Sequence, residues 1–122
     1  MNPLKALIIE DDEKLADIYS LTLQAGNFHT EIVSDGALAM MRLHEVMPRL
    51  VILDLHLPHV SGREILRKIR ASEQLAHIKV IVTTADDRMA DMTRADASLV
   101  LLKPVSPEQL RALAERIVQE ED

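Results

Sequence analysis

Residues 51–58 have the sequence Val-Ile-Leu-Asp-Leu-His-Leu-Pro, in which three consecutive apolar residues run into one aspartate, Asp54. An uninterrupted apolar run of this kind is typical of a strand that is covered on both faces, as in a parallel sheet. The segments at 7–9 and 80–82, Leu-Ile-Ile and Val-Ile-Val, have the same character. Together these segments predict the centre of a parallel sheet.

The rest of the chain alternates short apolar runs with segments of helical periodicity. The predicted strands are residues 4–9, 28–33, 50–55, 78–83 and 99–102, and the predicted helices are residues 12–25, 36–47, 62–73, 86–95 and a last helix capped by Ser106. Gly26 predicts a left-handed residue at the end of the first helix. Right-handed crossovers then give an α/β fold, a doubly wound (βα)5 sandwich with a five-stranded parallel sheet and helices on both faces.

Length and composition restrict the functional classes. The 122 residues, 48% of them hydrophobic, suffice for one domain, residues 1–122, with one core. A net charge of −6 argues against a nonspecific nucleic-acid binder, and the absence of cysteine excludes thiolate chemistry. Because no apolar window is long enough to cross a bilayer and no leader pattern is present, we expect a soluble, cytoplasmic protein that does not bind membranes.

Polar residues follow four of the predicted strands. Function in an open parallel sheet collects at the carboxyl ends of the strands. Carboxylates gathered there repel one another unless a cation lies among them, and an all-oxygen cluster suits a hard ion such as Mg²⁺. An aspartate beside such an ion and a fixed ammonium can accept a phosphoryl group. The residues at these ends are Glu10, Asp11, Asp12, Asp54, Thr83, Thr84, Lys103 and Pro104.

Simpler explanations exist for several of these residues. Acidic residues after a strand often cap the next helix, and we prefer that explanation for Asp12. Glu10 and Asp11 would alone be taken as solvated loop residues, but the aspartate of the third strand favours a shared site. Lys103 follows four apolar residues and precedes a proline, which favours the same edge over an ordinary surface position. Thr84 is a common type of strand residue, and only its place at the strand end favours a role.

Four motifs occur in a specific order and spacing. They are Leu-Ile-Ile-Glu-Asp-Asp at 7–12, the 51–58 segment with Gly62, Val-Ile-Val-Thr-Thr-Ala at 80–85 and Leu-Lys-Pro at 102–104. With them, the chain from Lys5 to about Val118 resembles the bacterial receiver domains of two-component response regulators, the CheY-like superfamily. The resemblance implies a flavodoxin-like fold whose sheet has the strand order 2-1-3-4-5. It also implies a phosphoprotein that works as a signalling switch rather than as a metabolic enzyme.

The resemblance also implies a metal site. Asp54 would be both the phosphoacceptor and a metal ligand. Asp11 and Glu10 would be the acidic pair that binds Mg²⁺ or Mn²⁺ directly or through water. The backbone carbonyl of His56 would be a further ligand.

The phosphoryl oxygens would be held by the other strand ends. By the same resemblance, Thr84 and the backbone amide of Ala85 would hydrogen-bond the phosphoryl group, with Thr83 the less favoured choice. Lys103 would pair with another oxygen, and its bond to Pro104 is a candidate for the cis form.

The implied partners are proteins. The donor would be a phosphohistidine on a sensor histidine kinase or phosphotransfer protein, and the receiver would assist its own phosphorylation and dephosphorylation. The new charge would bias a surface around the fourth helix, fifth strand and fifth helix, which a downstream protein or effector domain would recognise. On that surface Val100 replaces a frequent aromatic residue, Asp96 replaces a glycine, and the fourth helix is expected to be short.

Three other functions are compatible with the sequence. A receiver that keeps the fold but signals only through protein contacts would fit the changes at Val100 and Asp96. A phosphohydrolase would need a second acid two residues beyond the nucleophile, where His56 stands. A flavodoxin-like cofactor binder would need donors where the loops carry acids. The receiver could be free-standing or excised from a larger regulator.

Overall fold

The computed structural model describes residues 4–120, so residues 1–3 and 121–122 of the predicted domain lie outside the described residues. Five strands alternate with five helices over this range. The strands are β1 (Leu4–Ile9), β2 (Phe28–Val33), β3 (Leu50–Asp54), β4 (Lys79–Thr84) and β5 (Leu99–Leu102). The helices are α1 (Glu13–Ala25), α2 (Gly36–Val46), α3 (Gly62–Ala71), α4 (Asp87–Thr93) and α5 (Pro107–Gln119).

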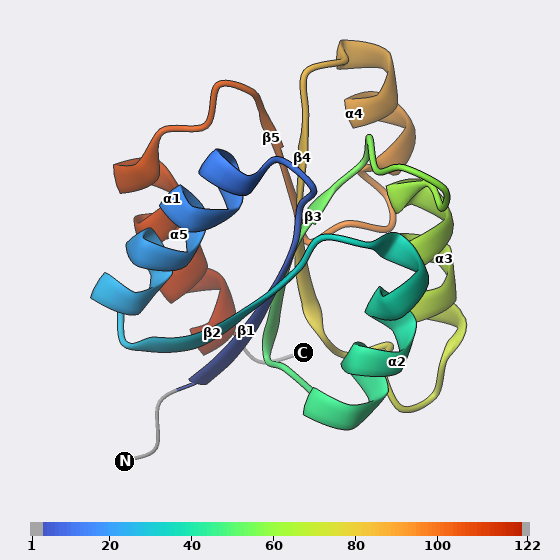
Figure 1. Cartoon of the computed structure of the whole chain (residues 1–122), viewed down its shortest axis with the longest axis horizontal. Helices are drawn as coiled ribbons and strands as arrows, with labels where there is room; N and C mark the ends of the chain where they lie inside the picture. The colour runs from blue at the N-terminus through green and yellow to red at the C-terminus, as the bar shows by residue number, and fades with distance from the viewer. Residues whose placement is uncertain (1–3, 121–122) are drawn as a thin grey trace.

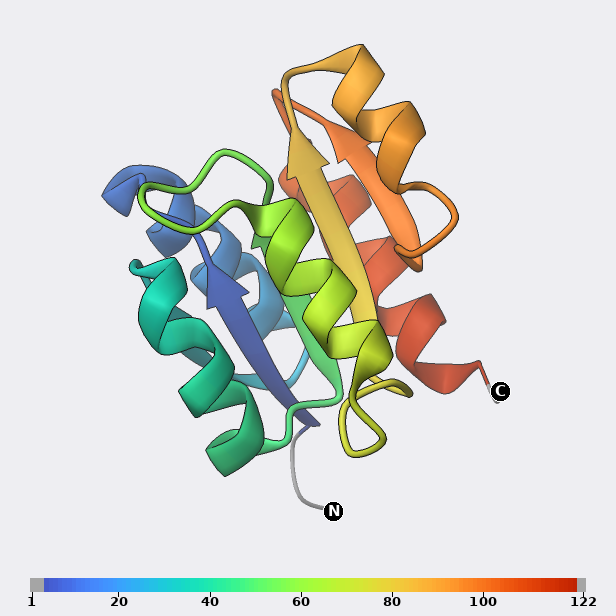
Figure 2. The same ribbon diagram turned by 90° about the vertical axis from the view of Figure 1, so that its right-hand side faces the viewer.

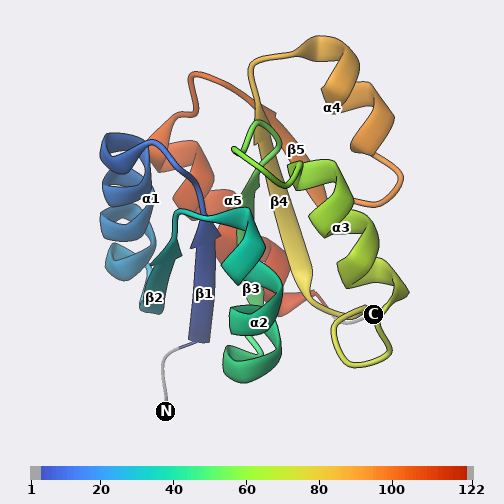
Figure 3. The same cartoon turned by 45° about the vertical axis from the view of Figure 1, so that its right-hand side comes forward.

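The strands form one sheet in the order β2-β1-β3-β4-β5, and every neighbouring pair is parallel. In Figure 1 the sheet runs between two helical layers, with α1 and α5 on one side and α2, α3 and α4 on the other. Figure 3 shows β2 at one edge beside β1. The predicted doubly wound sandwich and its strand order are confirmed.

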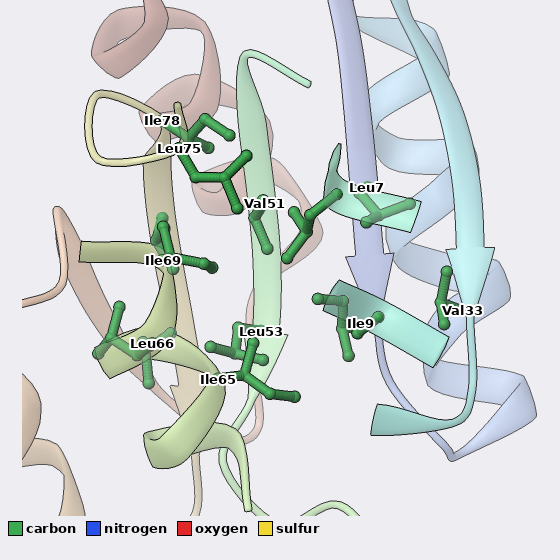
Figure 4. Close-up of a cluster of buried hydrophobic side chains, with 14 of the residues drawn as sticks. Leu7, Ile9, Val33, Val51, Leu53, Ile65, Leu66, Ile69, Leu75 and Ile78 are labelled. Carbon is green, nitrogen blue, oxygen red and sulfur yellow. The ribbon is translucent and has the colours of Figure 1, made fainter. Parts of the chain in front are cut away.

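Two apolar clusters fill the spaces on either side of the sheet. Figure 4 shows the cluster beneath α2 and α3, where Leu7 and Ile9 of β1 and Leu53 of β3 meet helix residues such as Ile65. In Figure 2 these two helices lie side by side over this face of the sheet. The second cluster lies beneath α1 and α5 and includes Ile8, Ile52 and Ile81. Successive strand residues thus serve opposite cores, which explains why the central strands are apolar without interruption.

This alternation also decides which side chains leave the sheet on which face. Ile8 and Ile52 face α1 and α5, so Glu10 and Asp54, two residues further along each strand, start on the same side. Thr83 is paired in register with Asp54 and follows Ile81 on that face. Thr84 belongs to the opposite face.

The ends of the elements differ from the predictions in informative ways. The left-handed residue after α1 is Asn27, with φ 69°, and not Gly26, whose φ is −93°. The Gly26 N–H donates a hydrogen bond to Leu23 O at 2.9 Å, which closes the last turn of α1. The chain then changes direction at Asn27, and asparagine tolerates the left-handed region. The strand predicted at 78–83 is Lys79–Thr84, so Thr84 is its last residue.

Helix starts follow the predicted capping chemistry. The Asp12 side chain accepts a hydrogen bond from Leu15 N at 3.0 Å, and Ser106 accepts one from Gln109 N at 3.3 Å. The fourth helix has only seven residues, as expected. Within residues 4–120, no helix combines the length and hydropathy needed to cross a bilayer.

Candidate functional site

Three predicted acidic residues meet at the carboxyl edge of the sheet. The end of β1 supplies Glu10 and Asp11, and the last residue of β3 is Asp54. One carboxylate oxygen from each lies within 4.8 Å of the others. This all-oxygen set is close enough to hold one hard divalent cation, directly or through water.

Burial makes it energetically costly for the carboxylates of this cluster to be charged. Glu10 is 1% and Asp54 2% exposed, whereas Asp11 is exposed. Burial, opposed in part by a hydrogen bond from Asp12 N at 3.1 Å and reinforced by the charge of Asp54, raises the pKa of Glu10 to about 7. Two buried carboxylates this close therefore need a compensating positive charge.

Lys103 supplies one such charge from the residue after β5. Its Nζ lies 3.2 Å from Glu10 Oε1 and 3.5 Å from Asp54 Oδ2. Burial alone would lower the pKa of Lys103, but the charges of Asp54 and Glu10 outweigh it and raise that pKa. The lysine thus stays an ammonium ion, and the Lys103–Pro104 bond is cis.

Backbone contacts fix the position of Asp54. Its Oδ1 accepts a hydrogen bond from His56 N at 3.1 Å, and Leu55 N donates to Thr83 O at 3.2 Å. The start of α3 packs directly on this strand end, because a Cβ on Gly62 would lie 2.3 Å from Asp54 O. The carboxylate is therefore presented by a stiff junction between β3 and α3.

Thr84 lies at the same edge but does not bond Asp54 in this structure. Its buried hydroxyl accepts from Asp86 N at 3.1 Å and lies 3.2 Å from His56 Nε2. Ala85 follows it as an exposed residue. The contact between the His56 ring and Thr84 was not predicted, because residues 28 positions apart in different loops leave no periodic signal in the sequence.

The arrangement combines a buried carboxylate, two further acidic side chains close enough to share a cation, and an ammonium group held beside them. These are the parts needed to transfer a group that carries negative charge, because each positive partner offsets charge on the transferring oxygens. The site lies at the edge where loops, rather than core elements, approach a substrate.

Comparisons with known proteins point to one family. A family model described as "Response regulator receiver domain" matches residues 6–115. The "Probable methanogenesis regulatory protein FilR2" of Methanothrix harundinacea is 37% identical over 127 residues, covering 95% of this chain and 82% of that protein. The "DNA-binding response regulator MtrA" of Mycobacterium tuberculosis is 30% identical over 111 residues, covering 88% of this chain.

The chain spans only 47% of MtrA, about half of its length. Among solved structures, the receiver domain of sensor histidine kinase PA1611 from Pseudomonas aeruginosa superposes with a TM-score of 0.88 at 22% identity. The match covers 97% of this chain and 99% of that one, and that structure is described as having a magnesium ion coordinated in the active-site cleft. At this identity the likeness supports the fold.

Proposed function

The chain belongs to the response regulator receiver domain family, and we propose that Asp54 is the residue that accepts its phosphoryl group. The observation that carries this proposal is the position of the Lys103 ammonium, 3.5 Å from a nearly buried Asp54 that shares a cluster with Glu10 and Asp11. Glu10 shares the burial and the contact with Lys103, so the choice of Asp54 rests on its place as the last residue of β3 and in the 51–58 motif that resembles receiver domains. The family's phosphoryl-transfer role is consistent with this assignment.

The step is a transfer between two nucleophiles. An Asp54 carboxylate oxygen forms a bond to phosphorus while the P–N bond of a phosphohistidine breaks, and the leaving imidazole nitrogen keeps the electron pair of that bond. Magnesium or manganese held by Glu10, Asp11, Asp54 and the His56 carbonyl would neutralise charge on the transferring oxygens. Lys103 holds one phosphoryl oxygen, and the Thr84 hydroxyl and Ala85 amide hold another.

Hydrolysis of the aspartyl phosphate completes the cycle, so the protein assists its own phosphorylation and dephosphorylation without acting on a metabolite. We propose that the Thr84 hydroxyl exchanges its contact with His56 Nε2, now 3.2 Å away, for one with the phosphoryl group. Because Thr84 connects β4 to α4, this movement is transmitted to the start of α4. The switch therefore begins at the contact between Thr84 and His56.

The proposed partners are proteins in the cytoplasm: a sensor histidine kinase or phosphotransfer protein as donor, and a downstream protein or effector domain as receiver of the signal. The output surface is built from α4, β5 and α5. Met92 and Leu102 expose apolar side chains there, 52% and 44% respectively, while Val100 is half-buried and has no ring to rotate. We propose that residues 1–122 act as one receiver unit, alone or within a longer regulator, without contacting nucleic acid or membrane themselves.

The direct test is incubation with acetyl phosphate and Mg²⁺, followed by intact-mass spectrometry. One phosphoryl adduct is expected on the native chain and none on Asp54→Asn. Asp12→Asn is the matched control, because it also removes one carboxylate near the site but retains a good helix cap, and it should load normally. No adduct on the native chain would contradict the proposal and favour a receiver that signals through protein contacts alone.

A further inference from the structure

Two buried hydroxyl groups beneath the site have no hydrogen-bond partner among residues 4–120: Tyr19 Oη and Thr83 Oγ1. Tyr19 is 2% exposed and Thr83 is fully buried, so bulk water does not substitute for a partner. Buried polar groups are nearly always paired, and an exception calls for an explanation. One explanation is a second state of the protein in which the partner arrives.

Both hydroxyls lie on the side of the sheet that faces α1 and α5, under the acidic cluster. Thr83 is in register with Asp54. Tyr19 lies in the middle of α1, and helical side chains lean towards the N-terminal end of their helix, which here is the end next to Glu10. Tyr19 and Lys103 also line one cavity of about 520 Å³, together with Leu15 and Val105. The phenol ring of Tyr19 therefore lies between α1 and the sheet, on the side of the sheet where Glu10 and Asp54 begin.

The charges of the site reach this phenol. Burial raises the pKa of Tyr19, Lys103 lowers it, and the charges of Glu10 and Asp54 raise it further. The net direction is upward, so the hydroxyl keeps its proton at neutral pH. Tyr19 is thus a buried hydrogen-bond donor without a partner, near enough to Glu10 and Asp54 for their charges to affect its pKa.

Phosphorylation of Asp54 changes the hydrogen-bond partners that are available to Glu10. In the present structure Glu10 Oε2 accepts from Asp12 N at 3.1 Å, and Oε1 pairs with Lys103 Nζ at 3.2 Å. When Lys103 turns towards a phosphoryl oxygen on Asp54, Oε1 of a carboxylate that is only 1% exposed loses its donor. A buried carboxylate oxygen without a hydrogen-bond donor is costly. A metal ion bound through the other Glu10 oxygen would leave Oε1 without a donor, whereas the Tyr19 hydroxyl could supply one.

We propose that Tyr19 is a positioning residue whose hydroxyl donates to Glu10 Oε1 when Asp54 is phosphorylated, which releases Lys103 to hold the phosphoryl group. This inference rests on the proposed function of Asp54. It gives the site a direct connection to α1, on the opposite side of the sheet from Thr84 and α4. Tyr19 touches neither the phosphoryl group nor the attacking oxygen, so it acts through Lys103 and Glu10.

The chain has one tyrosine and no tryptophan, so its tyrosine fluorescence reports Tyr19 alone. We would titrate the native protein with beryllofluoride, a stable phosphoryl mimic, in Mg²⁺ and follow that emission, with Asp54→Asn as the blank. A carboxylate acceptor quenches tyrosine emission, so loading should quench the native protein and leave Asp54→Asn unchanged. Emission that stays constant while the native protein loads would overturn the inference.

The second measurement removes the single oxygen with Tyr19→Phe. Because this hydroxyl is unpaired at rest, the urea midpoint of the unloaded variant should not fall, whereas its beryllofluoride affinity, measured by calorimetry, should fall roughly tenfold, as for a lost hydrogen bond to a charged group. Ser20→Ala is the matched control. It removes the neighbouring hydroxyl, which bonds Thr30 Oγ1 at 2.7 Å, and should lower the urea midpoint but not the affinity.

Native affinity in Tyr19→Phe, or a lowered urea midpoint without ligand, would overturn the inference while leaving Asp54 as phosphoacceptor. If the native protein takes up neither beryllofluoride nor a phosphoryl group from acetyl phosphate, the proposed function itself fails, and the role of Tyr19 fails with it.

Discussion

Gly62 stands where the start of α3 meets the strand end that carries Asp54. Its N–H donates to Leu55 O at 3.1 Å, and a Cβ added to it would lie 2.3 Å from Asp54 O and 2.7 Å from Leu55 Cα. Both neighbours are main-chain atoms, so no side chain can rotate to make room. We predict that Gly62→Ala displaces the end of β3 from α3 by roughly 0.7 Å, the difference between 2.3 Å and a barely tolerable 3.0 Å.

The expected cost follows from two opposing effects. Overpacking costs roughly 1–3 kcal/mol, and the upper part of this range applies because the clash is with backbone. Alanine is a better helix former than glycine by up to about 1 kcal/mol. The free energy of unfolding of Gly62→Ala should therefore fall by about 2 kcal/mol, and beryllofluoride affinity should fall as well because Asp54 is displaced.

Gly36 offers a matched control, since it is also the first residue of a helix that follows a side-chain cap. A Cβ there would meet Val60 Cβ and O at 3.2 Å and Ile65 Cδ1 at 3.3 Å, which small shifts can relieve. Gly36→Ala should stay within about 1 kcal/mol of the native protein, because tighter packing and better helix propensity oppose each other.

The assay is urea unfolding of the three proteins, followed by far-ultraviolet circular dichroism at one pH. The prediction is that Gly62→Ala has a clearly lower urea midpoint than Gly36→Ala, with similar slopes. If Gly62→Ala proves as stable as Gly36→Ala, then the junction between β3 and α3 is not the rigid support described above, and helix propensity alone governs this position.

Three further predictions concern the cluster, its ammonium and the core. Because the folded-state pKa of Glu10 is raised to about 7 from an ordinary 4.5, its protonated form favours folding, and that contribution is present below pH 4.5 and is lost as the pH rises to 7. In metal-free urea titrations at pH 5 and 7.5, Glu10→Gln should thus gain stability relative to the native protein at the higher pH, by up to about 3 kcal/mol, and an unchanged difference would contradict the buried state of this carboxyl. Lys103→Met, which keeps the apolar stem, should slow acetyl phosphate labelling at least roughly tenfold, as measured by time-resolved intact mass, and labelling at the native rate would remove the ammonium from the mechanism. Ile69→Ala empties a fully buried position of α3 and should cost about 2–5 kcal/mol in urea unfolding, whereas a loss below about 1 kcal/mol would mean that the core beneath α3 collapses to fill the space.

The sequence predicts the structure correctly where a local pattern, or the general geometry of a parallel sheet, determines it. Apolar runs such as 51–53 predicted the central strands because both faces of a parallel strand are buried. The acids and the lysine were predicted to meet because parallel strands deliver their last residues to one edge. Capping by Asp12 was predicted from local hydrogen-bond chemistry, and the structure confirms it.

What the sequence could not predict depends on contacts between distant segments. The hydrogen bond between His56 and Thr84 joins two loops, and the unpaired hydroxyl of Tyr19 is defined by what surrounds it in three dimensions. The left-handed turn was assigned to Gly26 although Asn27 adopts it, because either residue type tolerates that conformation and only the final bonding pattern of the helix end selects one.

Reduction by borohydride identifies the phosphorylated side chain most directly. Borohydride converts an aspartyl phosphate to homoserine, so peptide mapping of protein labelled with acetyl phosphate and Mg²⁺ locates the modified residue. If Asp54 is the phosphoacceptor, homoserine should appear at position 54 and nowhere else. Conversion at Asp11 or Asp12 with Asp54 intact, or an adduct that survives on Asp54→Asn, would contradict it.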